Sequence, residues 1–127
     1  GIIGLGEAAK YLQKVGFDFI QKQEALLTKA VQSGIESIPG LRLIGPQDPG
    51  LRGGITTFYI DGVDSHRVAI MLDQMANICV RSGQHCVHSW FNARGIVGSV
   101  RASVYFYNTL DEIAIFTENL QKLRKVL

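Results

Sequence analysis

The sequence predicts an α+β domain in which helices pack on one face of a small, mainly antiparallel sheet. Long stretches of the 127-residue chain repeat apolar residues at helical spacing, and several shorter stretches are rich in β-branched and aromatic residues. The two kinds of segment follow one another in mixed order, which is typical of an α+β layer. A chain of this length forms one domain, residues 1–127, and can bury a core without disulfides or a structural metal.

The N-terminal part of the chain predicts two successive helices and a short strand. Apolar residues recur at helical spacing over residues 5–15, and Gly16 ends this first segment. Asp18 is expected to act as the N-cap of a second, longer helix, which the Pro-Gly pair at 39–40 ends. Residues 41–44 are a strand candidate. We expect the first helix to pack beside another domain rather than to stand alone.

The middle of the chain predicts a loop, a strand and a helix. Residues 45–54 contain two prolines and four glycines and are therefore expected to form a loop. Residues 55–60 carry the β-branched and aromatic side chains of a strand. Either Asp64 or Ser65 is expected to cap the helix that follows, which runs to about Met75.

The C-terminal part predicts two further strands and two helical segments. Residues 78–81 and 99–106 are the strand candidates, and residues 91–95 are expected to form one helical turn. Thr109, followed three residues later by Glu112, matches a capping box, in which each residue's side chain bonds the other's backbone N–H. A final amphipathic helix is therefore expected from this point to the end of the chain.

The charge and composition of the chain favour a globular protein without a polyanionic partner. Its 13 Lys and Arg against 11 Asp and Glu leave a net charge of +2, so no nucleic-acid partner is predicted. No targeting sequence and no apolar run long enough to cross a membrane are visible, and the predicted compartment is the cytoplasm. Because the chain opens with Gly1, we expect it to be a piece of a longer protein.

A thiol lies beside two imidazoles and a guanidinium in the segment 80–89. Cys86 is flanked by His85 and His88, Gly83 allows the chain to bend, and Arg81 lies five positions earlier. Nearby cationic groups favour the thiolate, which is the reactive form of cysteine. On these residues alone, a reactive thiol and an inert surface cysteine are equally acceptable interpretations. The spacing matches no usual structural zinc pattern, so no metal site is predicted.

Two more residues bear on the chemistry. Arg101 lies between Val100 and Ala102 in an apolar strand, where an arginine needs a partner. That partner could be the carboxylate of a bound substrate or an acidic side chain at the edge of the core. Cys79, between apolar neighbours, is expected to be a small buried hydrophobe in a strand. A pair of cysteines this sparse is not a disulfide framework, and no serine triad is visible.

These segments together resemble the C-terminal small domain of the cysteine desulfurases, which are class-V aminotransferase relatives dependent on pyridoxal phosphate. The resemblance covers essentially the whole chain, from the glycine-rich start at 1–6 to Tyr-Asn-Thr at 107–109. Its specific part is the loop Arg-Ser-Gly-Gln-His-Cys at 81–86, with Arg-Ala-Ser following at 101–103. One branch of the family carries Arg-x-Gly-His-His-Cys there. The resemblance also implies the small-domain fold of fold-type I pyridoxal-phosphate enzymes.

The resemblance implies a role for four residues. Cys86 matches the nucleophile that takes sulfur from L-cysteine as a persulfide while L-alanine is released. Arg101 matches the arginine that binds the substrate carboxylate, Arg81 matches an active-site arginine beside the substrate, and His85 matches a loop histidine without a fixed role. The family further implies pyridoxal phosphate as cofactor, a homodimer, and a sulfur acceptor such as an iron–sulfur scaffold protein.

Two departures and one absence qualify what the resemblance implies. Gln84 replaces the first histidine of the usual His-His-Cys, and residues 87–90 replace a commoner proline-containing sequence. The Schiff-base lysine of the family belongs to the large domain, so we expect this chain alone to be inactive. Two alternatives follow: a non-catalytic module that carries sulfur or binds the acceptor, and a domain of a related class-V enzyme such as a selenocysteine lyase.

Overall fold

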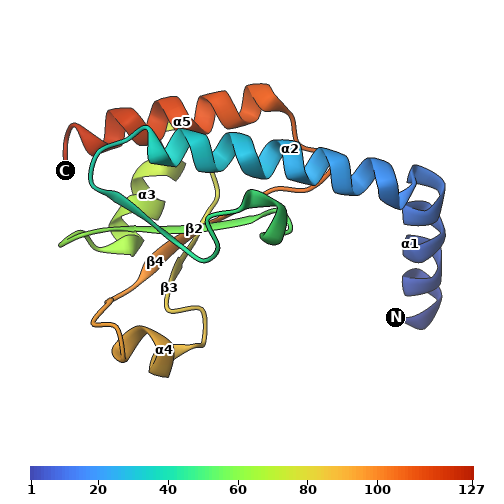
Figure 1. Cartoon of the computed structure of the whole chain (residues 1–127), viewed down its shortest axis with the longest axis horizontal. Coiled ribbons are helices and arrows are strands. Elements are labelled where there is room, and N and C mark those ends of the chain that lie inside the picture. The colour runs from blue at the N-terminus through green and yellow to red at the C-terminus, as the bar shows by residue number, and fades with distance from the viewer.

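The computed structural model describes all residues, 1–127, and its centre is one four-stranded antiparallel sheet (Figure 1). The strand order is β1-β2-β4-β3, so β3 lies at one edge beside β4. The sheet is small and antiparallel, as the sequence predicted, and the fold class is α+β. The strands are β1 (Leu41–Ile44), β2 (Ile55–Ile60), β3 (Arg81–Gly83) and β4 (Ser99–Ser103).

Helices α2, α3 and α5 cover one face of this sheet, whereas the connection between β3 and β4, which contains α4, extends away from α2 and α5 (Figure 1). The predicted loop at 45–54 contains one short 3₁₀ turn, Pro49–Leu51. The helices are α1 (Ile2–Val15), α2 (Phe17–Glu36), α3 (Ser65–Ala76), α4 (His88–Asn92) and α5 (Leu110–Arg124). No helix is both long enough and apolar enough to span a membrane.

The core forms where one face of the sheet meets these helices. Side chains alternate between the faces of a strand, and in β2 the fully or nearly fully buried ones are Thr56, Phe58 and Ile60. In β4 the buried pair is Val100 and Ala102, which belong to the same cluster. The helices contribute apolar residues at helical spacing from their inner sides. These are Leu27, Val31 and Ile35 of α2, Val68 and Leu72 of α3, and Ile113, Phe116, Leu120 and Leu123 of α5.

Two of the three predicted helix caps are confirmed. The Thr109 hydroxyl accepts from the Glu112 N–H at 3.2 Å, and the Glu112 carboxylate accepts from the Thr109 N–H at 2.8 Å. This bond from the Thr109 backbone also lowers the pKa of Glu112. Asp64 caps α3 by accepting from the N–H of His66. The cap predicted at Asp18 is wrong.

Helix α2 begins one residue before Asp18, at Phe17, because the chain breaks at Gly16. Gly16 has a φ of 93°, which glycine adopts without steric cost, and it separates α1 from α2. Asp18 therefore lies in the first turn of the helix. A carboxylate there still interacts favourably with the positive end of the helix dipole.

Several predicted boundaries shift for reasons of pairing. Strand β3 covers 81–83 rather than 78–81, because its partners on β4 are residues 99–101. Strand β4 ends at Ser103 rather than at residue 106. Beyond it the chain turns, because the Asn108 side chain accepts from the Tyr105 N–H at 2.9 Å. The predicted helical turn at 91–95 starts earlier, as α4.

Helix α1 extends away from the end of α2 and does not join the core (Figure 1). None of its residues is buried, and Ile2, Ile3 and Leu5 expose 90%, 85% and 72% of their surface. Apolar side chains this exposed leave α1 without the packing that stabilises most helices. That another domain packs against it stays a prediction.

Helix α5 supports the sheet through Leu120, and truncating this side chain is expected to destabilise the fold strongly. Leu120 is fully buried, so Leu120→Ala leaves a cavity and costs about 2–5 kcal/mol of unfolding free energy. Leu110 begins the same helix but is 49% exposed, so Leu110→Ala is the matched control and costs about 1 kcal/mol or less. Urea unfolding followed by circular dichroism measures both, and equal losses would contradict this view of the core.

Candidate functional site

The segment carrying Cys86 is a tight turn in an unusual conformation. The Val87 N–H donates to the Gln84 carbonyl at 3.0 Å, which closes a four-residue turn with His85 and Cys86 at its centre. These two residues have φ of 52° and 65°. Positive φ at both central positions defines a type I′ turn, which glycine and asparagine normally occupy. The thiol is thus presented on strained backbone that a histidine and a cysteine adopt at a cost.

Side chains on both sides of the turn hold it against the start of β4. The Gln84 amide donates to the Val97 carbonyl at 3.0 Å, and His85 Nε2 lies 3.0 Å from the Ser99 hydroxyl. The His85 ring also contacts the buried ring of Phe91, with 6.3 Å between the ring centroids. The turn therefore has a defined position relative to the sheet, although Cys86 itself is exposed.

Two predicted site residues, Arg81 and Arg101, are direct partners in the antiparallel pairing of β3 with β4. Because Val100 and Ala102 on either side of Arg101 face the core, Arg101 faces the other side of the sheet. Thr57 of β2 is the partner of Arg101 on its other side. The sheet face away from the helices thus carries a row of two guanidinium groups and one hydroxyl.

Neither arginine has an acidic partner. The salt bridges of the chain are Lys10–Glu7, Arg42–Asp61 and Lys122–Glu118. The Nε atom of Arg101 is buried and makes no hydrogen bond. Of the two partners that the sequence left open for Arg101, the acidic side chain at the edge of the core is therefore absent. A buried donor without a partner is costly, so the Nε atom of Arg101 is an unsatisfied donor on this face of the sheet.

The two arginines also act on the neighbouring imidazole. Burial lowers the pKa of His85 from its ordinary value of 6.5, and the positive charges of Arg101 and Arg81 lower it further. His85 is therefore neutral near pH 7 and serves as a hydrogen-bonding group rather than as a cation. The structure brings all four predicted site residues, Arg81, His85, Cys86 and Arg101, to the β3–β4 end of one sheet face.

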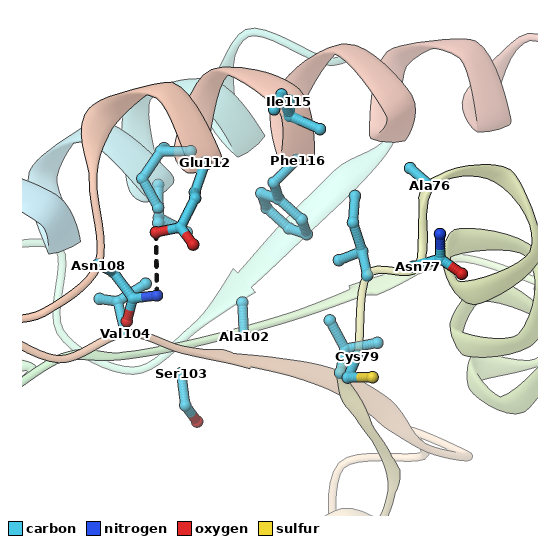
Figure 2. A pocket seen from close by; sticks show the side chains of 14 residues that line it. Ala76, Asn77, Cys79, Ala102, Ser103, Val104, Asn108, Glu112, Ile115 and Phe116 are labelled. Atoms are coloured by element: carbon cyan, nitrogen blue, oxygen red, sulfur yellow. Dashed lines mark hydrogen bonds between the residues drawn. The ribbon is translucent and has the colours of Figure 1, made fainter.

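Cys79 is not the buried strand residue that the sequence predicted. It is exposed and precedes β3, and it lines a hollow of about 330 Å³ between the end of α3, β4 and α5. Figure 2 shows Glu112 and Asn108 at one end of this hollow and Cys79 with Asn77 at the other. The strand prediction fails because β3 starts at Arg81, two residues after Cys79. The hollow does not include Cys86.

Sequence reasoning missed three contributors to the site. Ser99 and Gln84 fix the turn, and Thr57 extends the row of polar side chains. Ser99 and Thr57 are separated from the Cys86 loop along the chain, and only strand pairing places them beside it. The turn with positive φ at both His85 and Cys86 has no clear sequence signal, because neither is the glycine or asparagine that such a turn normally contains. No three His, Cys, Asp or Glu side chains gather as a metal site requires.

This arrangement can bind a small anion and present a thiol to it. Two unpaired guanidinium groups suit a carboxylate, which arginine binds through two parallel hydrogen bonds. The exposed thiol of Cys86 is accessible for nucleophilic attack. The site is open on one side, because the face of the sheet that carries it is not covered by α2, α3 or α5.

Comparison with known proteins identifies the family of this chain. Residues 1–116 match the model of the family described as aminotransferase class-V. A probable cysteine desulfurase of Methanothermobacter thermautotrophicus is 39% identical over 97% of this chain and 31% of its own length. One of Synechocystis sp. is 42% identical over 94% of this chain and 28% of its own. The apo structure of the cysteine desulfurase from Thermococcus onnurineus superposes with a TM-score of 0.93, at 35% identity over 100% of this chain and 31% of that one.

The fold and the family match define an α+β domain of the kind found in pyridoxal-phosphate enzymes. The chain belongs to the class-V aminotransferase family, and its similarity to cysteine desulfurases over essentially its whole length supports a cysteine desulfurase domain. It spans about three-tenths of the length of the relatives that it matches.

The pKa of His85 provides a test of this electrostatic arrangement. Replacing Arg101 by Gln removes a nearby positive charge, so Arg101→Gln is expected to raise the pKa of His85, measured from its ring proton shifts by NMR. Arg94→Gln is the matched control, since Arg94 stacks on Trp90 and does not act on His85. An unchanged pKa in Arg101→Gln would show that the two groups do not interact.

The same shift predicts how stability depends on pH. The unfolded chain binds a proton at His85 more readily than the folded chain does, because only the folded pKa is lowered. This group therefore makes stability fall as pH drops below its ordinary value of 6.5 and level off below the folded pKa. Urea unfolding of His85→Gln, compared with the unchanged protein between about pH 7.5 and about pH 5, is expected to show a smaller pH dependence of the unfolding free energy.

Proposed function

We propose that this chain is the C-terminal small domain of a pyridoxal-phosphate-dependent cysteine desulfurase, which converts L-cysteine to L-alanine and enzyme-bound sulfur. The observation that carries the proposal is the unpartnered pair Arg81 and Arg101 on the same sheet face as the exposed Cys86 turn. Similarity to relatives named as probable cysteine desulfurases supports the activity. These relatives are about three times as long as this chain, which supports its being one domain of a larger enzyme.

The residues present fit a cofactor that is held mainly by the rest of such an enzyme. Every lysine lies on α1 or α2, or in the last turn and at the cap of α5, so none shares the sheet face of the arginines. The two unpaired guanidinium groups fit the carboxylate of an amino-acid substrate. When bound, pyridoxal phosphate supplies an electron sink that weakens the carbon–sulfur bond of the substrate.

In this proposal each residue of the chain has a distinct task. Arg101 holds the substrate carboxylate through two hydrogen bonds, and Arg81 adds positive charge beside it. The Cys86 sulfur attacks the substrate sulfur, so that an S–S bond forms while the bond between that sulfur and Cβ breaks. The electron pair of the broken bond stays with the carbon skeleton, which takes up a proton and leaves as alanine. His85 keeps the turn in place.

The proposal extends to partners and location. The persulfide on Cys86 would pass its sulfur to an acceptor such as an iron–sulfur scaffold protein, and the exposure of this turn supports such access. The complete enzyme would be a cytoplasmic homodimer with pyridoxal phosphate bound in its large domain. Without that domain the 127-residue chain is expected to be inactive. Incubated with L-cysteine and pyridoxal phosphate, it should release alanine no faster than the cofactor alone.

The two cysteines allow a matched test of the nucleophile. In a complete enzyme, Cys86→Ser is expected to abolish persulfide formation and alanine release, because a serine hydroxyl cannot form the S–S bond to the substrate sulfur. Cys79→Ser is the control, since Cys79 is equally free and exposed but lies in the other hollow. Persulfide is measured by mass spectrometry of the cysteine-containing peptides. Full turnover by Cys86→Ser would refute the assigned role.

A substitution of Arg101 that keeps the positive charge tests whether the guanidinium geometry is needed for substrate binding. Arg101→Lys keeps a positive charge but loses the planar fork, so KM for L-cysteine is expected to rise about tenfold, corresponding to one lost charge-assisted hydrogen bond. Arg94→Lys, just after α4, is the control and should leave KM unchanged. Equal KM values for both variants would remove Arg101 from the binding site.

A second function is favoured by the exposure of Cys86 on a domain without the cofactor lysine. The chain would then carry sulfur on Cys86, or bind an acceptor, without catalysis. Incubation with a persulfide donor, followed by mass spectrometry, decides this: sulfur on Cys86 and none on Cys79 supports a carrier, and no added sulfur excludes it. Preference of a complete enzyme for selenocysteine over cysteine, measured as alanine release from each substrate, would instead indicate a selenocysteine lyase.

A further inference from the structure

The thiol turn, residues 84–87, lies beside a backbone segment that the rest of the domain holds in place. In this segment the Ile96 N–H donates to the carbonyl of Phe91 at 3.1 Å, and Phe91 is buried. At Gly98 the chain is packed so closely that an added Cβ atom would lie 2.8 Å from a hydroxyl oxygen of α3. Val97 lies between these two residues, so its carbonyl has a fixed position although its side chain is exposed.

Gln84 joins the thiol turn to this segment with its side chain and closes the turn with its backbone. Its Nε2 atom donates to the Val97 carbonyl at 3.0 Å. Its own carbonyl accepts from the Val87 N–H, also at 3.0 Å. The first and the last residue of the turn are thus both tied to Gln84, and a displacement of Gln84 would move the whole turn.

The conformation of the thiol turn requires such a restraint. His85 and Cys86 have φ of 52° and 65°, where the Cβ atom of an L-residue crowds the backbone. The backbone of Cys86 makes no hydrogen bond, so its neighbours set its position. A turn that relaxed to negative φ would change the direction of the Cys86 side chain, because that direction depends on φ. The contact of His85 with Ser99 restrains the residue before Cys86, and the Gln84 bond restrains the residue before that.

We propose that Gln84 is a positioning residue for Cys86: its side-chain amide, bonded to the Val97 carbonyl, holds the thiol turn in the positive-φ conformation that sets the direction of the thiol. The inference rests on the proposed function only in taking Cys86 as the working thiol. Gln84 takes no part in the bond changes and acts through the backbone of the turn. Attack by one sulfur on another requires a defined approach, so a displaced thiol loses rate.

The conformation of the turn is measured directly by NMR on the unaltered 127-residue chain. Positive φ brings the amide proton of a residue close to its own Hα, so the nuclear Overhauser effect (NOE) between these two protons is strong. Negative φ separates the two protons and weakens this NOE. The expected result is a strong NOE within both His85 and Cys86. A weak NOE within either residue would overturn the proposal without any variant of Gln84.

Variants of Gln84 test whether its amide is responsible. Gln84→Met keeps the length of the side chain but has no donor, and Gln84→Glu presents an acceptor to the Val97 carbonyl. Both are expected to weaken the NOEs within His85 and Cys86, because the turn relaxes. Gln121→Met is the matched control, since Gln121 is exposed on α5. Unchanged NOEs in Gln84→Met, or equal weakening in Gln121→Met, would overturn the proposal.

The effect on the reaction is measured in a complete enzyme. Gln84→Met is expected to lower kcat for alanine release about fivefold, the equivalent of one hydrogen bond. KM for L-cysteine should stay unchanged, because Arg81 and Arg101 are held by the pairing of β3 with β4. Unchanged kcat, or a raised KM with unchanged kcat, would refute a positioning role while the proposed function stands. Failure of the proposed function is recognised separately, because Cys86→Ser would then keep its turnover.

Discussion

The site depends on the antiparallel pairing of β3 with β4. Strand β3 has only three residues, and its register places Arg81 opposite Arg101 and Gly83 opposite Ser99. Cross-strand partners that do not exchange hydrogen bonds lie about 4.5 Å apart, and those that do lie about 5.5 Å apart, measured between Cα atoms. A shift of β4 by one residue would turn Arg101 towards the core, because successive side chains face opposite sides of a strand. The buried pair Val100 and Ala102 excludes that alternative.

The same pairing holds a turn that its own residues disfavour. Positive φ at His85 and Cys86 costs roughly 1–2 kcal/mol at each residue. The bonds from Gln84 to Val97 and between His85 and Ser99 return about 1 kcal/mol each. The hydrogen bonds thus offset much of the conformational cost, so these side-chain contacts stabilise the turn in its position. The residue that departs from the family pattern, Gln84, supplies one of these contacts.

The two faces of the sheet have different roles: one forms the core and the other carries the candidate site. One face is covered by three helices and supplies the stability, through a core that contains no charged residue. The other face carries positive charge with no carboxylate to neutralise it, together with a neutral imidazole and a free thiol. A carboxylate from outside the chain is the natural complement of such a face. The apolar side chains of α1 belong to neither face and are exposed in this structure.

Local sequence signals determined the fold class, the order of most elements and the caps at Asp64 and Thr109, because periodicity and capping depend on residues a few positions apart. They also singled out Cys86, His85, Arg81 and Arg101 as candidates. The bounds of β3, the exposure of Cys79, the opposition of the two arginines and the contact between His85 and Ser99 were decided by the tertiary structure alone. Each of these depends on which strands pair and in which register, and that is settled only when the side chains of distant segments pack into one core.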